Sequence, residues 1–276
     1  MVLKYNRAEL SERLARTRRE GRLIIAAGAG TGLSAKCAEA GGADLILVFN
    51  SGRFRMDGHG SLSGLLAFGN ANEIALEMGE RQVLPVVKET PVICSVHAAD
   101  PTRCMERHLE EVMKRGFSGI NNFPTAGLID GNFRRMLEAT NLGYAKEVEL
   151  VKLAAAKDIF AIVYAFNVDE AVAMARAGAD AVVVHVGLTV GGTIGGKESL
   201  TIVQAAELTM TITQACKEIN PRVLILAHGG PLSTPRDLRE FLSLAPVDGF
   251  VGASSMERLP TERAITETVR EFKTIG

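Results

Sequence analysis

Short apolar runs recur along the chain, separated mostly by segments with helical periodicity. Near-continuous runs of Val, Ile and Leu are typical of strands that are covered on both faces, as in parallel sheets. Eight such runs are present, at 23–30, 44–52, 91–100, 118–124, 159–167, 180–187, 222–230 and 248–255. The pattern therefore predicts eight parallel strands.

The segments between these runs predict amphipathic helices. Segment 101–116 has Pro101 near the expected helix start and Gly116 near its end, and segment 167–178 has Asn167 as N-cap and Gly178 as C′ glycine. Residues 6–21 predict an extra helix before the first strand. Strands that alternate with crossover helices in this way predict an α/β fold, a (β/α)8 TIM barrel with an extra N-terminal helix, formed by residues 1–276 as a single domain.

Glycine and serine residues follow the last two predicted strands. In a TIM barrel the C-terminal strand ends carry the active site, and the loops after strands seven and eight commonly bind phosphate. Exposed backbone N–H groups in such loops can approach an anion closely. We expect a phosphate-binding set made of Gly229, Gly230, Gly252, Ser254 and Ser255. Tight turns in a crowded barrel mouth are the alternative interpretation of the same glycines.

Histidines end three of the predicted strands. His185 and His228 end neighbouring strands, so their imidazoles are predicted to meet in one pocket as catalytic acid and base near neutral pH. His97 is a third catalytic candidate at the end of segment 91–97. A purely structural role for each ring is the alternative.

Two glycine-rich connections add candidate binding residues. Segment 50–72 reads as a long loop in which Arg53 and Arg55 could hold a carboxylate or phosphate, although arginines that satisfy loop carbonyls or lie in a subunit interface fit equally. Segment 187–199 is typical of a lid, with Lys197 at its base. The predicted substrate-binding residues in these and neighbouring connections are Asn50, Ser51, Arg53, Asn121 and Lys197.

The charge balance narrows the class of partner. Lys and Arg number 31 against 32 Asp and Glu, giving a formal net charge of -1, so no global field attracts nucleic acid or an anionic membrane. A small anionic substrate must be recognised locally. The four cysteines show no C-x-x-C spacing, and no signal peptide or membrane-length apolar run is present, so we expect reduced thiols and a cytoplasmic location.

Candidate metal ligands are few. Asp100 and Glu257 follow the third and eighth predicted strands, and neither forms a carboxylate pair at short spacing. A dedicated Mg²⁺ cage is therefore not evident, although Mg²⁺ often needs only one or two carboxylates together with substrate oxygens. The requirement for Mg²⁺ stays open at this point, with Asp100 and Glu257 as its candidate ligands.

Several long motifs identify a family resemblance that spans about residues 7–272. The motifs are NSGRFRMDGHGSLSGLLAFGNAN, NNFPTAGLIDGNFRRMLEATNLGY, HVGLTVGGTIGG, AHGGPLSTP and GFVGASSMERLP. They resemble the phosphoenolpyruvate hydrolase-like family, some members of which are described as phosphonopyruvate hydrolases or barrel signal-transduction domains. The chain is also similar to the C-terminal barrel of a plant protein that blocks tobamovirus replication.

The resemblance implies the TIM barrel and a substrate class, a small phosphorylated or phosphono oxoacid. The resemblance implies the substrate class more directly than the reaction mechanism. Phosphonopyruvate hydrolases and phosphoenolpyruvate mutases hold Mg²⁺ with clustered acids after their early strands, where this chain reads VFNSGR and SVHAADP with only Asp100. The mutase-type cleavage of a P–C bond is therefore not carried over with the substrate class.

Three functions follow from these observations. The leading hypothesis is a hydrolase or lyase acting on a phosphoenolpyruvate-like acid, with acid/base histidines at the barrel mouth. A metal-dependent, aldolase-like C–C lyase is the second, because no strand-end lysine offers a Schiff base. A non-catalytic barrel that senses a phosphometabolite or contacts another protein is the third. Self-association into a homo-oligomer is expected in each case.

Overall fold

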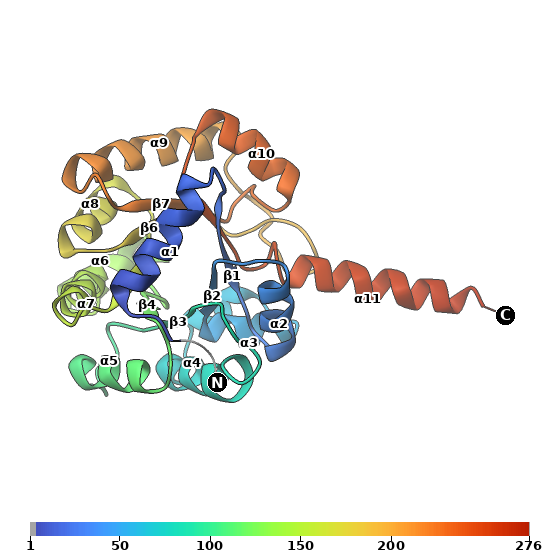
Figure 1. The fold of residues 1–276 in the computed structure, drawn as a ribbon, viewed down its shortest axis with the longest axis horizontal. Coiled ribbons are helices and arrows are strands. Elements are labelled where there is room, and N and C mark those ends of the chain that lie inside the picture. The colour runs from blue at the N-terminus through green and yellow to red at the C-terminus, as the bar shows by residue number, and fades with distance from the viewer. Residues whose placement is uncertain (1–3, 276) are drawn as a thin grey trace.

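The computed structural model describes residues 4–275, in which eight parallel strands close into a barrel in chain order (Figure 1). The last strand pairs with the first, with Ile24 opposite Gly249. The strands are β1 (Ile24–Gly28), β2 (Leu45–Val48), β3 (Val92–Ser95), β4 (Gly119–Asn121), β5 (Phe160–Ala165), β6 (Ala181–His185), β7 (Leu224–His228) and β8 (Gly249–Gly252). The predicted TIM barrel with its extra N-terminal helix is confirmed.

Helices occupy the connections and both ends of the chain. They are α1 (Arg7–Arg19), α2 (Gly32–Ala40), α3 (Asn50–Met56), α4 (Ala71–Met78), α5 (Met105–Lys114), α6 (Gly131–Ala139), α7 (Tyr144–Ala156), α8 (Val168–Ala177), α9 (Ile202–Ile219), α10 (Pro235–Leu244) and α11 (Arg258–Lys273). Short 3₁₀ turns at Ser61–Leu65 and Ala126–Leu128 and a π turn at Gly79–Val83 complete the connections. Across residues 4–275, none of these helices combines the length and apolarity needed to span a membrane.

The strands are buried on both faces, which explains why their sequences are apolar without interruption. In β6, Ala181 and Val183 belong to the cluster inside the barrel, and Val182 and Val184 pack between the sheet and the surrounding helices. Successive side chains of a strand point to opposite faces, so each β6 residue is assigned to one layer by its position.

Helix α1 lies across the N-terminal ends of the strands (Figure 1). Arg7 pairs with Asp180 at 2.9 Å just before β6, and the Thr17 hydroxyl donates to Asp44 at 2.8 Å just before β2. Leu10 is fully buried against the cluster inside the barrel, and this burial stabilises the packing of α1 on the barrel by about 1.5–3 kcal/mol. Helix α1 therefore covers the N-terminal ends of the strands and leaves their C-terminal ends uncovered.

Two expected boundaries differ from the structure. The segment after β2, expected to be a loop, begins with the seven-residue helix α3, in which Arg55 is buried. Helix α5 begins at Met105 rather than near Pro101, because the Asp100 side chain accepts from the Thr102 amide and hydroxyl and holds this segment in a turn. Other boundaries are confirmed: Asn167 caps α8, and Gly178 ends it with a positive φ of 97°.

Candidate active site at the barrel mouth

A small cavity of about 60 Å³ opens among the C-terminal strand ends. A larger surface cavity, of about 510 Å³, lies beside α5 and α7 and contains none of the strand-end histidines. The small cavity brings together residues in or just after the C-terminal ends of β2, β4, β5, β6, β7 and β8. Its lining residues are Phe49, Ser51, Arg55, Ser61, Leu62, Phe123, Leu128, Tyr164, His185, Leu188, Thr189, His228, Ala253 and Ser254.

The imidazoles of His185 and His228 lie side by side in this cavity. Parallel pairing of β6 with β7 sets the two residues directly opposite each other. Their ring centroids are 4.8 Å apart with the planes at 66°. Tyr164 packs against both rings, at 5.4 and 5.2 Å, and Phe166 packs against His185 at 4.8 Å. Aromatic walls therefore shield both imidazoles from water.

Each imidazole uses Nδ1 for a backbone contact. Nδ1 of His228 lies 2.8 Å from the carbonyl oxygen of Val251, and the Gly187 amide donates to Nδ1 of His185 at 3.2 Å. Burial, together with the Arg55 cation, lowers the pKa of His228 to about 4, and burial beside His228 holds the pKa of His185 well below its usual range. Both rings are accordingly neutral at pH 7.

Arg55 reaches the same cavity from α3 and forms a buried ion pair with Glu257. Its Nε and Nη2 lie 3.0 and 2.7 Å from Oε2 of Glu257, and both side chains are 2% exposed. The other carboxylate oxygen accepts from the Gly30 amide at 2.6 Å and from the Ser34 hydroxyl. Glu257 thus neutralises Arg55, while Nη1 of Arg55 makes no hydrogen bond within residues 4–275.

The expected phosphate-binding set is only partly assembled around the cavity. Ser254 lines it, whereas the Gly230 amide donates to the carbonyl of Gly187 at 2.8 Å and is occupied. Gly229 has a φ of 84°, and a Cβ there would meet the same carbonyl at 2.1 Å. Gly252 lies within β8 against Met256, whose side chain an added Cβ would meet at 2.5 Å. The residues outside the lining are Gly229, Gly230, Gly252 and Ser255.

Among the remaining predicted binding residues, Ser51 lines the cavity. Asn50 is buried and donates to the carbonyl of Gly64 at 2.8 Å, which ties down the connection after α3. Asn121 is fully buried and donates to the carbonyl of Ile162 at 2.7 Å.

Arg53, Lys197 and His97 lie outside the cavity lining. Arg53 pairs with Glu77 on α4 at 2.9 Å, and Lys197 is exposed in the connection after β6. His97 directs Nδ1 toward the carbonyl of Pro124 at 3.2 Å. Of the three predicted catalytic histidines, the structure therefore brings two together.

The two candidate metal ligands do not fit a Mg²⁺ site. Asp100 accepts from Thr102, Asn70 and Asn72, and although burial acts to raise its pKa, these hydrogen bonds hold the pKa well below the usual range. Glu257 is engaged by Arg55, as described above. No cluster of three or more His, Cys, Asp or Glu side chains suited to a metal occurs within residues 4–275. We therefore derive no step through Mg²⁺.

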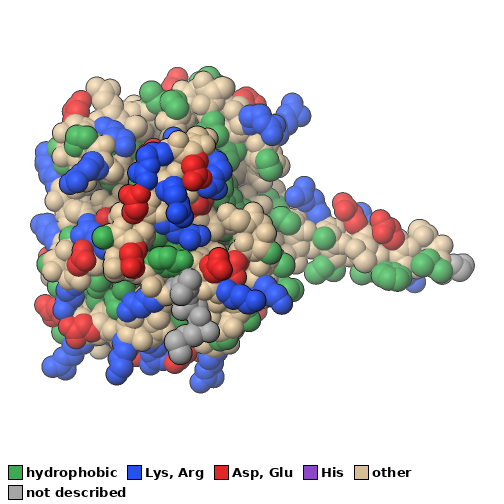
Figure 2. All heavy atoms as spheres, viewed as in Figure 1, with side chains coloured by type: hydrophobic (Ala, Val, Ile, Leu, Met, Phe, Trp, Pro, Cys, Tyr) green, Lys and Arg blue, Asp and Glu red, His purple; other side chains and the backbone are tan. Residues whose placement is uncertain are grey.

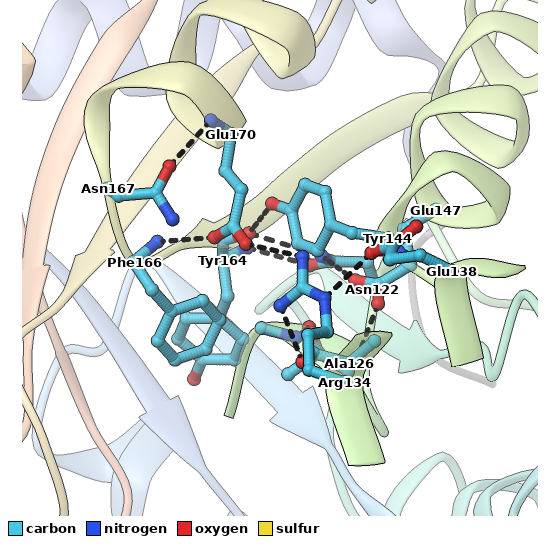
Figure 3. A network of polar contacts seen from close by, with 12 residues as sticks. Asn122, Ala126, Arg134, Glu138, Tyr144, Glu147, Tyr164, Phe166, Asn167 and Glu170 are labelled. Carbon is cyan, nitrogen blue, oxygen red and sulfur yellow. Dashed lines mark hydrogen bonds and ion pairs between the residues drawn. The ribbon is translucent and has the colours of Figure 1, made fainter. Parts of the chain in front are cut away.

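A polar network behind the cavity holds the two aromatic walls in place (Figure 3). Asn122 accepts from the Tyr164 amide at 2.7 Å and donates to the Tyr164 carbonyl at 3.1 Å. The Phe166 amide donates to Glu170 at 3.1 Å, and Glu170 pairs with Arg134 at 2.9 Å. The rings that pack on the imidazoles are therefore fixed through their own backbone.

Glu147 is the buried centre of this network. Its carboxyl oxygens accept from the Ala126 amide at 2.7 Å and the Asn122 side chain at 2.6 Å. Asn122 cannot turn its amide over without losing the Tyr164 amide as donor. Burial raises the pKa of Glu147 to about 8, although the hydrogen bond from Ala126 acts to lower it.

We expect Glu147→Gln to be less stable than the wild type by about 1–3 kcal/mol at pH 5. The NH₂ group of the glutamine would face either the Ala126 amide or the Asn122 side-chain amide, and both of these groups are donors. The folded protein holds a proton on Glu147 that the unfolded chain releases, so wild-type stability falls as pH rises from about 4.5 to about 8. This loss is absent in the variant. The free energy of unfolding of the wild type, measured relative to that of the variant, therefore falls by about 1.4 kcal/mol per pH unit over this range. Urea unfolding of both proteins at several pH values measures it; a gap independent of pH would contradict the assignment.

Tyr164 and Arg55 are cavity residues with titratable or charged groups that the predicted set of site residues did not contain. Tyr164 belongs to the fifth apolar run, where a hydroxyl-bearing ring one residue from the strand end was the available signal. The sequence offers Arg53 and Arg55 alike, and the predicted binding set contains Arg53. Its partner Glu257 lies 202 positions away, which no local pattern indicates.

Comparison with known proteins agrees with this architecture. Residues 9–275 match the phosphoenolpyruvate hydrolase-like family. The chain is 52% identical over 258 residues to the ToMV susceptible protein tm-1(GCR26) of Solanum lycopersicum, a match that covers 93% of this chain and 34% of that protein. The chain thus spans about a third of the length of this curated relative.

Two solved structures share the fold at low sequence identity. The structure of 2,3-dimethylmalate lyase, a member of the PEP mutase/isocitrate lyase superfamily, aligns with a TM-score of 0.64 and 16% identity over 98% of this chain and 88% of that one. A phosphonopyruvate hydrolase complex with oxalate and Mg²⁺ aligns with a TM-score of 0.59 and 18% identity, over 96% and 86%. These likenesses support the barrel, and the match along nearly the whole sequence supports the assignment: the chain belongs to the phosphoenolpyruvate hydrolase-like family.

Proposed function

We propose that the protein is a hydrolase or lyase that acts on a small phosphorylated or phosphono oxoacid at the barrel mouth. The observation that carries the proposal is the pair of buried imidazoles, His185 and His228, beside the free Nη1 of Arg55 in one small cavity. Such a cavity suits a substrate of a few carbon atoms. The solved phosphonopyruvate hydrolase, which holds oxalate, supports the same ligand class.

In this proposal each residue has a separate task. Arg55 donates a charge-assisted hydrogen bond to the substrate carboxylate or phosphoryl group, without bringing net charge because Glu257 neutralises it. Ser51 and Ser254 add hydroxyl groups at the cavity wall. The imidazoles move the proton that the reaction requires. The aromatic walls exclude bulk water from the reacting atoms.

The test of this function is turnover by the purified chain. Phosphoenolpyruvate and water would give pyruvate and inorganic phosphate, and phosphonopyruvate and water would give the same two products. Both are measured with and without added Mg²⁺, and a 2-alkylmalate is included to detect a C–C lyase. Release of pyruvate from either phospho-compound supports a hydrolase. Cleavage of the malate alone would replace it with the lyase, and no product from any of the three would contradict both.

A regulatory barrel is the second candidate, and the name of the tomato relative supports it, since that protein is described by its relation to a virus. In this case the cavity binds a phosphometabolite and releases it unchanged. Saturable binding of phosphoenolpyruvate without any product distinguishes this candidate from an enzyme.

Self-association through α11 is a further part of the proposal. The helix projects away from the barrel (Figure 1), and apolar side chains lie along its length (Figure 2). Ile265, Val269 and Phe272 stand on one face at helical spacing and are 60, 55 and 68% exposed. An apolar stripe of this kind on a protruding helix fits a second copy of the chain.

We expect the double variant Ile265→Glu/Val269→Glu to change the oligomeric state, because charged side chains on the stripe would lose their water in a contact. Light scattering after size exclusion should give a dimer or larger assembly for the wild type and a monomer for the variant. The matched control is Glu267→Gln on the same exposed helix, which should keep the assembly. A monomeric wild type would contradict the proposal.

A further inference from the structure

The free cavity carries no net charge at neutral pH. The titratable and charged side chains that line it are Arg55 from α3, Tyr164 from β5, His185 from β6 and His228 from β7. Glu257 cancels the charge of Arg55, and burial raises the pKa of Tyr164 further above neutrality, so its hydroxyl stays protonated and uncharged. An anion entering this cavity therefore brings a charge that no fixed cation balances.

The Nε2 atoms of the two imidazoles differ in protonation. A backbone carbonyl only accepts, so the Val251 contact requires the proton of neutral His228 on Nδ1 and leaves a bare lone pair on Nε2. A backbone amide only donates, so the Gly187 contact requires a bare Nδ1 on His185 and places its proton on Nε2. Neither Nε2 makes a hydrogen bond within residues 4–275, and both residues line the cavity.

We propose that His228 is the residue that takes up a proton at Nε2 when a small anion binds, and that His185 serves as a fixed Nε2–H hydrogen-bond donor to the same ligand. The inference rests on the proposed function, since it assigns the two histidines of that site their separate roles. His228 can accept the proton without changing its contact to Val251. His185 would have to accept it at Nδ1, against the Gly187 amide.

Electrostatics support the uptake of a proton by His228 when an anion binds. A negative charge beside an imidazole favours its protonated form and typically shifts the pKa by about 1–3 units. The pKa of His228 in the free cavity is about 4, so a bound anion raises this pKa toward the pH range in which the proton can be exchanged with substrate. The proton comes from the solvent, and no other group in the cavity changes its charge.

Calorimetry of oxalate binding to the whole chain tests the proton uptake. Oxalate is doubly ionised near pH 6, so any proton taken up goes to the protein. Titrations near pH 6 in two buffers of different ionisation enthalpy should give different heats, equivalent to an uptake of about 0.1 to 0.9 proton per oxalate for a pKa shift of about 1–3 units. The Kd should rise by up to about tenfold per pH unit between about pH 5 and pH 7. Binding without proton uptake contradicts the assignment and leaves the proposed anion site intact, whereas no binding at any pH contradicts the anion site itself.

Two further measurements separate the histidines. Proton uptake should disappear in His228→Gln and persist in His185→Gln, and the reverse result would overturn the assignment. The second measurement needs no ligand: long-range ¹H–¹⁵N spectra of ¹⁵N-histidine-labelled wild type report the tautomer of each ring, with the signals assigned by single variants. We expect the Nδ1–H tautomer for His228 and the Nε2–H tautomer for His185, and the same tautomer for both would contradict the proposal.

Discussion

Replacing Arg55 by methionine is expected to destabilise the fold by about 3–5 kcal/mol, because it leaves the buried carboxylate of Glu257 without its cation. The double variant Arg55→Met/Glu257→Gln should recover most of that loss. The glutamine carbonyl can still accept from the Gly30 amide, and no unpaired charge remains. Urea unfolding of the wild type, both single variants and the double variant gives the coupling energy of the pair directly.

The same helix supplies a matched control. Arg53 lies two residues away and pairs with Glu77, but its side chain is 30% exposed and that of Glu77 is 46% exposed. Water already solvates this pair, so Arg53→Met should cost less than about 1 kcal/mol. Equal losses for Arg53→Met and Arg55→Met would show that the Arg55–Glu257 pair is not a special element of the barrel mouth.

Loss of the His228 imidazole is the second large effect that we expect. If the chain turns over a phospho-oxoacid, His228→Asn should lower kcat/KM by about 10²–10⁴, the range contributed by a positioned acid or base. The asparagine removes the proton-accepting ring while it remains small and polar. Phosphate release under saturating and subsaturating substrate separates a change in kcat from one in KM.

The matched control for this experiment is His59→Asn. His59 is exposed in the connection after α3, so its replacement should leave kcat/KM unchanged. Unfolding of each variant in urea establishes that the folded fraction is the same during the assay. Full activity of a folded His228→Asn protein would remove His228 from the reaction.

The barrel could be predicted from the sequence because its signals are local. Each strand is an apolar run, and each run is buried on both faces, so no partner strand has to be known to recognise it. The same signal predicts a candidate site at the barrel mouth, since polar residues begin where the apolar runs end. His185 and His228 were found in this way, and their contact needed only the expectation that β6 and β7 are neighbours.

The details of the site depended on contacts that the sequence does not contain. The sequence predicts a loop at residues 50–56, and a loop gives no basis for choosing between Arg53 and Arg55. In helix α3 these positions are about 200° apart around the axis, so only one of them can face the cavity. The choice is made by Glu257, which follows β8 and reaches Arg55 only when the barrel closes.

The glycines of the barrel mouth illustrate the same limit. A sequence motif indicates which backbone amides could be free to bind an anion. Whether an amide is free depends on whether a carbonyl of a neighbouring loop accepts its hydrogen bond. The Gly230 amide is used by the carbonyl of Gly187, a contact between the connections after β7 and β6. Ser254, by contrast, lines the cavity, and its role in phosphate binding stays a prediction.

The central claim is that the imidazole pair at the barrel mouth receives a small anionic acid, and ligand-induced changes in the histidine signals test it most directly. The chain has five histidines, so each resonance of the ¹⁵N-histidine-labelled protein can be assigned with single variants. On addition of phosphoenolpyruvate we predict saturable shifts of the His185 and His228 signals, with those of His59 and His108 unchanged. A spectrum in which the signals of His185 and His228 do not move, or move no more than that of His59, would contradict the account.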